Sequence, residues 1–146
     1  MKKKENGMDE RIVRFLKKHH VLTLATAVNS SPYCSNLFYA WLETEQAFVF
    51  TSSLDTKHAA DALANPQVAA SVVLETRTVG KLQGLQLQGK MYRPEGELLQ
   101  KAKKQYIKRF PYAAVADLEL WLLEPSRAKM TDNTLGFGKK LLWERG

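Results

Sequence analysis

The residues best suited to carry chemistry lie in one short segment, Thr51-Ser52-Ser53-Leu54-Asp55-Thr56-Lys57-His58, between an apolar run and an alanine-rich run. The start of a helix offers free backbone N–H groups and a partial positive charge, both of which favour a bound phosphate. Five side chains of the segment can add a hydrogen bond or a charge: Thr51, Ser52, Thr56, Lys57 and His58. The segment therefore indicates a phosphate-binding loop. A structural alternative stays open, in which Asp55 or Thr56 caps the helix and Lys57 points to water.

Other common chemistries find little support in the sequence. His19 and His20 are adjacent and cannot share one face of a helix, and no carboxylate stands at metal-ligand spacing, so we expect no metal site. The single cysteine, Cys34, excludes a disulfide framework and is expected to be a buried, inert thiol. The glycines of residues 135–140 lack the spacing of a P-loop, and no nucleophile motif is present. No catalytic residue can be named from the sequence.

Hydrophobic periodicity predicts the elements that position this segment. A helix is expected over 8–18, strands over 21–28, 33–42 and 47–51, and a short helix over 59–64, which Asn65-Pro66 ends. Strands at 68–74 and 82–92, a helix from 94 to about 108, and strands at 118–122 and 126–131 follow. Closely spaced strands joined by tight turns predict a mainly β (α+β) fold, an antiparallel sheet that closes as a small barrel with flanking helices.

The length of 146 residues predicts a single domain over 1–146, with residues 1–7 as a flexible N-terminal tail. No apolar run approaches the roughly 20 residues that span a bilayer, and the basic start has no apolar segment behind it, so we expect neither a membrane anchor nor a signal peptide. A single cysteine suits a reducing compartment. The expectation is a soluble cytoplasmic protein.

The net charge of +7 is unevenly distributed. Residues 81–110 carry eight basic residues against two acidic ones, whereas residues 41–80 and 111–126 each sum to −3. A basic surface attracts polyanions or phosphorylated molecules, but charge alone does not identify a partner. No nucleic-acid-binding motif accompanies the charge. We therefore expect no nucleic-acid partner, and we interpret the basic residues of 101–109 as the solvated face of a helix.

Taken together, these pieces resemble the pyridoxamine-phosphate-oxidase-like, FMN-binding split-barrel superfamily. The resemblance rests on the segment 48–59, which is followed by Asn65-Pro66-Gln67-Val68, and on Gly89-Lys90 in a later strand. The tail Met130-Thr131-Asp132-Asn133-Thr134-Leu135-Gly136-Phe137-Gly138-Lys139-Lys140, with Arg109-Phe110-Pro111 before it, is similar to the YhbP-type subfamily of small split-barrel proteins. The likeness covers nearly the whole chain. It is specific for the fold and much less so for the activity.

The resemblance implies a homodimer with FMN at the interface. It places Ser35, Asn36 and Leu37 beside the isoalloxazine ring, and Ser52, Thr56, Lys57 and His58 at the phosphate, with Thr51 adjacent. Gln86 and Gln88 would reach the flavin from a neighbouring strand. Asn133, Lys139 and Trp143 of the tail would approach the flavin from one subunit or the other.

The chain departs from the superfamily pattern in its charges. Members that bind FMN tightly often carry Arg where Ser35 stands and Lys where Ala40 and His58 stand. Each lost charge-assisted hydrogen bond costs about 1.5–3 kcal/mol. We therefore expect either weak FMN binding or a different occupant of the pocket. Residues that would bind pyridoxamine phosphate are not recognisable, so oxidation of this vitamer is not expected.

The resulting hypothesis is a flavin-dependent oxidoreductase that acts on an unidentified small molecule. In such a protein the flavin carries the hydride chemistry, while the chain supplies a dry pocket and an anchor for the phosphate. The alternative is a non-catalytic flavin or haem carrier, or a sensor, that uses the same pocket.

Overall fold

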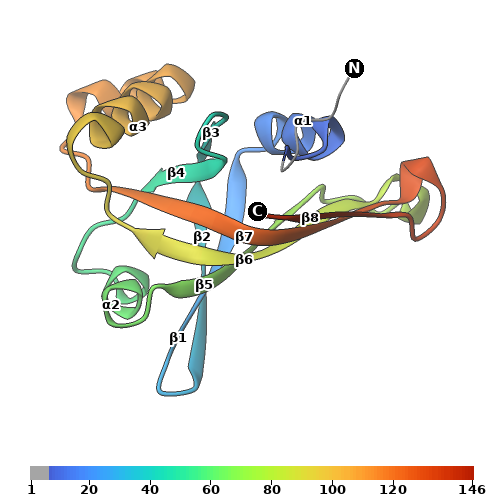
Figure 1. Ribbon diagram of the computed structural model, residues 1–146, viewed down its shortest axis with the longest axis horizontal. Coiled ribbons are helices and arrows are strands. Elements are labelled where there is room, and N and C mark those ends of the chain that lie inside the picture. Colours follow the sequence, from blue (N-terminus) through green and yellow to red (C-terminus); the bar gives the residue numbers. More distant parts are fainter. Residues whose placement is uncertain (1–6) are drawn as a thin grey trace.

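The computed structural model describes residues 7–146 (Figure 1). The expected N-terminal tail therefore lies outside the described residues, apart from Gly7. The three α-helices of the described chain are α1 (Glu10–Lys18), α2 (Lys57–Ala64) and α3 (Gly96–Arg109). Its strands are β1 (Val21–Val28), β2 (Ser31–Phe38), β3 (Ala40–Leu42), β4 (Ala47–Thr51), β5 (Gln67–Val73), β6 (Gln83–Tyr92), β7 (Leu120–Asp132) and β8 (Lys140–Glu144). Short 3-10 turns cover Val79–Lys81, Pro111–Val115 and Asn133–Leu135.

All strands join one antiparallel sheet, in the order β2-β1-β5-β6-β7-β4-β3, with β8 paired to β7. The sheet curls strongly, so that it forms an open half-barrel flanked by the helices (Figure 1). The expected antiparallel split barrel is confirmed. No helix among residues 7–146 combines the length and the apolar content needed to cross a membrane.

Alternation along the strands gives the sheet two different faces. The inner face packs on the main core, and its buried side chains include Leu22, Leu24, Val72, Leu85, Leu87 and Met130. The outer face carries the alternate residues, which are small or polar and partly or fully exposed along β1, β5 and β6. A second core lies where α3 covers β3, β4 and β7, around Ala102, Tyr106, Leu120 and Leu122.

Arg109 joins the C-terminal end of α3 to the C-terminal end of α1 through hydrogen bonds. Its guanidinium donates hydrogen bonds to the carbonyl oxygens of Lys17 (3.0 Å) and Tyr39 (3.1 Å), and also to that of His19. The last carbonyls of a helix have no partner within the helix, so this side chain satisfies groups at the end of α1 from the end of α3. Arg109, the first residue of the Arg109-Phe110-Pro111 motif, thus has a structural role.

Three boundaries differ from the sequence-based expectation. The strand expected over 33–42 breaks at Tyr39, whose hydroxyl donates to the carbonyl of Leu16 at 2.7 Å, because the chain here leaves β1 to pair with β4. The strands expected at 118–122 and 126–131 are one strand, β7, which passes through Pro125. The closing segment of the tail forms β8 against β7.

Strand β7 remains continuous through Pro125 because of a β-bulge. The pairing register shifts between Gln88 and Gly89, so that Gly89 lies opposite Pro125 while Gln88 lies opposite Arg127. A Cβ atom on Gly89 would come within 2.3 Å of the carbonyl oxygen of Glu124, a distance that no side chain can occupy. Glycine is therefore required where the two backbones approach this closely.

Candidate functional site

The predicted phosphate-binding loop joins β4 to α2, and Ser52 in it is hydrogen-bonded to Trp121 of β7 and to Glu119, the residue just before β7. The N–H of Ser52 donates to the carbonyl of Glu119, and the indole of Trp121 donates to the carbonyl of Ser52, both at 3.0 Å. Thr56 caps α2, since its hydroxyl accepts from the N–H of Ala59 at 3.3 Å and donates to the carbonyl of Ser53 at 2.7 Å. The structural alternative for Thr56 is thus confirmed. The first backbone N–H groups of α2 have no hydrogen-bond acceptor within the helix, as at the start of any helix.

The His58 imidazole is engaged within the loop. Its Nε2 lies 2.7 Å from Oγ of Ser52 and 3.4 Å from Oγ1 of Thr56. Burial lowers the pKa of His58, and the carboxylate of Asp61 only partly opposes this effect. His58 is consequently mostly neutral at pH 7 and brings hydrogen bonding rather than charge to the loop.

Lys57 does not point freely to water. Its Nζ lies 3.1 Å from Oδ1 of Asp61, one helical turn away, and 5.2 Å from the centre of the Tyr33 ring. Asp61 is only 7% exposed and also accepts a hydrogen bond from the hydroxyl of Thr26 at 2.9 Å. Burial opposes the ionisation of Asp61, but the hydrogen bonds from Lys57 and Thr26 outweigh it and lower its pKa. Lys57 is therefore paired with Asp61 within its own chain, while its side chain remains 55% exposed.

The residues expected beside the flavin ring fall on opposite faces of the sheet. Residues directly opposite each other in antiparallel strands share a face. Ser35 pairs with the buried Leu24 and so lies on the inner face, as does Leu37 opposite Leu22. Asn36 lies opposite Thr23 on the outer face, where the Thr23 hydroxyl donates to its amide oxygen at 2.9 Å.

Ser35 and Leu37, which we call the inner-face group, lie on the side of the sheet that α2 covers. Tyr33, two residues before Ser35 on the same face, contacts Lys57 and so connects β2 to the phosphate loop. Oγ of Ser35 is buried and has no hydrogen-bond partner among the described residues. A buried hydroxyl without a partner is costly, and a ligand group that binds it would remove that cost.

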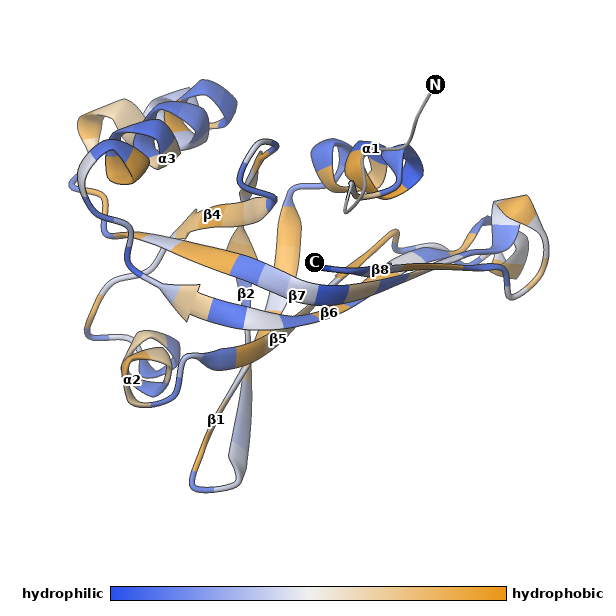
Figure 2. Ribbon diagram, in the orientation of Figure 1, coloured by the Kyte–Doolittle hydropathy of each residue, from blue (hydrophilic) through white to orange (hydrophobic). Residues whose placement is uncertain are grey.

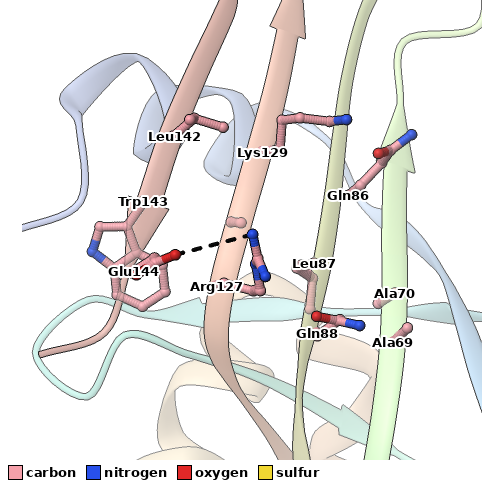
Figure 3. Close-up of a pocket in the computed structure, with 11 residues that line it drawn as sticks. Ala69, Ala70, Gln86, Leu87, Gln88, Arg127, Lys129, Leu142, Trp143 and Glu144 are labelled. Atoms are coloured by element: carbon pink, nitrogen blue, oxygen red, sulfur yellow. Dashed lines mark ion pairs between the residues drawn. The ribbon is translucent and has the colours of Figure 1, made fainter.

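Gln86 and Gln88, which we call the outer-face group, lie on the same face of the sheet as Asn36. They border a hollow of about 400 Å³ between β5, β6, β7 and β8 (Figure 3). We call it the outer hollow. Gln86 lies opposite Lys129 and Gln88 opposite Arg127, so that two amides and two cations project together. Arg127 also approaches Glu144, with 4.0 Å between Nη2 and Oε1. Arg127 and Lys129 are not among the site residues predicted from the sequence, although their alternation with Ala128 and Met130 indicates the exposed face of a strand.

The three tail residues lie in different surroundings. The side chain of Asn133 donates to the carbonyl of Val79 at 2.8 Å and accepts from the N–H of Gly138 at 2.9 Å, so it holds the turn before β8. Lys139 is exposed in that turn. Trp143 is 6% exposed and belongs to the main core, but it also borders the outer hollow.

Thr51 borders a second hollow, of about 480 Å³, on the α3 side of the loop. We call it the acidic hollow. Its lining holds hydroxyls, the carboxylates of Asp117 and Glu119, and no Lys or Arg: Thr51, Ser52, Ser53, Tyr106, Tyr112, Ala113, Ala116, Asp117, Leu118 and Glu119. Two carboxylates would repel a phosphate, so Thr51 is poorly placed for the role expected of it.

The expectation that Cys34 is buried is wrong, because its thiol is exposed. It lies on the outer face of β2, which is the end strand of the sheet and has no neighbour beyond it among the described strands. Among residues 7–146, no group of three or more His, Cys, Asp or Glu side chains is arranged to hold a metal ion.

The chain is similar in sequence to known proteins over most of its length. The family model described as pyridoxamine 5′-phosphate oxidase matches residues 8–132. A UPF0306 protein of Photorhabdus laumondii is 41% identical over 134 residues, which cover 92% of this chain and 94% of that protein.

Solved structures agree with the fold. A haem-binding protein from Mycobacterium smegmatis superposes with a TM-score of 0.71 at 23% identity, covering 86% of this chain and 52% of that longer one. An FAD-binding protein from Mesorhizobium loti superposes with a TM-score of 0.66 at 16% identity, covering 83% of this chain and 90% of that one. At these identities the likeness concerns the fold. With the family match over most of its length, the chain belongs to the pyridoxamine 5′-phosphate oxidase family of split-barrel proteins.

Proposed function

We propose that two copies of the chain bind FMN between them and that the flavin serves as the redox group of an oxidoreductase acting on an unidentified small molecule. One observation carries this proposal: Ser35 and Lys57 lie on the opposite side of the sheet from Gln86 and Gln88. A ligand that touches both sets needs the inner-face group of one chain and the outer-face group of another. A homodimer supplies both.

The residues present fit a flavin that spans such a junction. The unpartnered Ser35 hydroxyl is available to the ring, and the first turn of α2 to the phosphate. Within one chain, Lys57 is paired with Asp61 and burial lowers the pKa of His58, so a phosphate would gain from further positive charge. Arg127 and Lys129 of a second copy would provide it.

The chemistry would belong to the cofactor, since bound FMN accepts and passes on a hydride. The chain itself would anchor the phosphate, exclude water and orient the ring through the amides of Gln86 and Gln88. We also propose a cytoplasmic location, which the single cysteine and its free thiol support.

A carrier or sensor of flavin or haem is the second candidate. It is favoured by the engagement of His58 with Ser52, which leaves the described site without an unoccupied imidazole to act as a general base. The solved haem-binding relative has the same fold, which makes haem a reasonable ligand to test.

The visible spectrum of the purified protein tests both candidates, before and after addition of FMN or haemin and dialysis. Retained flavin absorption that NAD(P)H then bleaches would support the oxidoreductase. Retained flavin without reduction, or a Soret band with haemin alone, would support the carrier. A protein that keeps neither ligand at micromolar concentration would contradict the proposal.

A further inference from the structure

A turn that carries exposed apolar side chains and four cations ends the β6–β7–β8 ribbon. We call it the tip, residues 77–81 and 133–140. Phe137 is 85% exposed, Val79 61% and Leu135 42%. Figure 2 shows this apolar turn at the right-hand end of the molecule. Four cations and no carboxylate accompany these side chains: Arg77, Lys81, Lys139 and Lys140.

Hydrogen bonds within the chain fix the conformation of the tip. Asn133 binds Val79 and Gly138 through its side chain, and its N–H donates to the carbonyl of Leu82 at 3.0 Å. The buried Asp132 accepts from the N–H of Thr134 at 2.9 Å and from the side chain of Gln83 at 3.1 Å. An ordered turn that presents a bare phenyl ring loses little entropy on docking.

The acidic hollow has the complementary properties. Asp117 and Glu119 lie in its lining, which includes no Lys or Arg. Apolar side chains are exposed in or beside it, with Tyr112 at 66% and Val115 at 95%. A hollow of about 480 Å³ has room for an aromatic side chain.

The tip and the acidic hollow lie toward opposite ends of the long axis. In Figure 1 the turn before β8 is at the right, while the chain between α3 and β7 and the start of the β4–α2 loop are at the left. A two-fold axis perpendicular to the long axis therefore places each tip at the end of the other copy that holds its acidic hollow. Such a closed, isologous arrangement makes the contact twice and does not propagate into a filament.

We infer that the tip of one copy docks in the acidic hollow of a second copy, with Phe137 in the hollow and Lys139 and Lys140 facing Asp117 and Glu119. This inference rests on the proposed homodimer and specifies a contact within it. Because Ser52 and Ser53 line the hollow, the partner's tip would also lie beside the phosphate loop and stiffen it.

A charge swap tests this contact by sedimentation velocity and light scattering. The tip variant carries Lys81→Glu, Lys139→Glu and Lys140→Glu; the hollow variant carries Asp117→Lys and Glu119→Gln. Glutamine retains an acceptor for the N–H of Leu54, which Glu119 binds at 2.7 Å. Each variant alone should dimerise at least about tenfold more weakly than the wild type. An equal mixture should recover dimers, because a mixed pair restores opposite charges at both contacts.

Phe137→Asp should weaken dimerisation by at least about tenfold as well. Lys103→Glu, an exposed charge reversal on α3, and Leu63→Asp, at an exposed leucine on α2, are the matched controls. Dimers unaffected by the tip and hollow changes would overturn this contact while leaving the homodimer intact. A monomeric wild type would overturn both proposals. Binding of the wild type to phosphatidylserine vesicles that Phe137→Asp abolishes, with dimerisation unchanged, would assign the tip to a lipid surface instead.

Discussion

Nζ of Lys57 lies 3.1 Å from Oδ1 of Asp61, so the unambiguous cation of the phosphate loop is already paired within its own helix. The carboxylate is buried and held by Thr26 as well, which fixes the pair on the inner face. A phosphate at the start of α2 must therefore compete with Asp61 for Lys57. This competition, together with the neutral His58, gives a physical reason to expect weak FMN binding by a single chain.

Lys57→Ala should weaken FMN binding at least about tenfold, because it removes the cation and leaves Asp61 to repel the phosphate. Asp61→Asn should have the opposite effect and tighten binding, since it frees Lys57. Fluorescence titration of FMN measures both. Equal affinities in the two variants would remove this ion pair from the site.

Complementation tests whether each site takes residues from two chains. Lys57→Ala and Arg127→Ala homodimers should each lose tight FMN binding. When the two variants are mixed and exchanged, each mixed dimer should regain one intact site, because one chain supplies Lys57 and the other supplies Arg127. Equilibrium dialysis of the mixture measures the recovered sites. A mixture no better than its components would place both residues in the same chain's site or in none.

Gly89→Ala should lower the free energy of unfolding by about 1–3 kcal/mol, because the new methyl group would collide with the Glu124 carbonyl across the bulge. Gly84→Ala in the same strand is the matched control. A Cβ there would meet its nearest neighbour at 3.8 Å, an ordinary contact. Urea unfolding compares the two, and equal losses of stability would argue against a strict need for glycine at the bulge.

Arg109→Ala should destabilise the fold by about 2–3 kcal/mol, since hydrogen bonds from a charged group to three backbone carbonyls are lost together. Lys108→Ala, an exposed neighbour on the same helix, should change stability far less. Thermal and urea unfolding measure the difference. Similar midpoints for the two variants would show that the α1–α3 junction does not depend on Arg109.

The depressed pKa of His58 predicts a specific pH dependence of stability. The folded state takes up the proton less readily than the unfolded chain, so the free energy of unfolding falls as pH drops below the ordinary histidine pKa of about 6.5. His58→Gln should flatten this fall between about pH 7 and pH 5. His19, whose pKa is also lowered, is common to both proteins and cancels in the comparison. Identical slopes in urea unfolding would contradict the assignment.

Local sequence patterns determined most of the elements and the position of the loop. The strands over 21–28 and 47–51, the capping of α2 by Thr56 and its end at Asn65 follow from side-chain alternation and from backbone groups that neighbouring residues must satisfy. The spacing of four residues between Lys57 and Asp61 on a predicted helix also favours an ion pair, which is not among the predictions made from the sequence above.

Tertiary structure decided what the local patterns leave open. Only the pairing of β2 with β1, of β1 with β5 and of β5 with β6 places Ser35 on the opposite face from Gln86 and Gln88, because alternation within one strand does not say which of its faces aligns with a given face of another strand. The exposure of Cys34 depends on β2 being the end strand, and the continuity of β7 through Pro125 depends on the bulge at Gly89. These properties arise from pairings between residues far apart in the chain, which no local window of sequence contains.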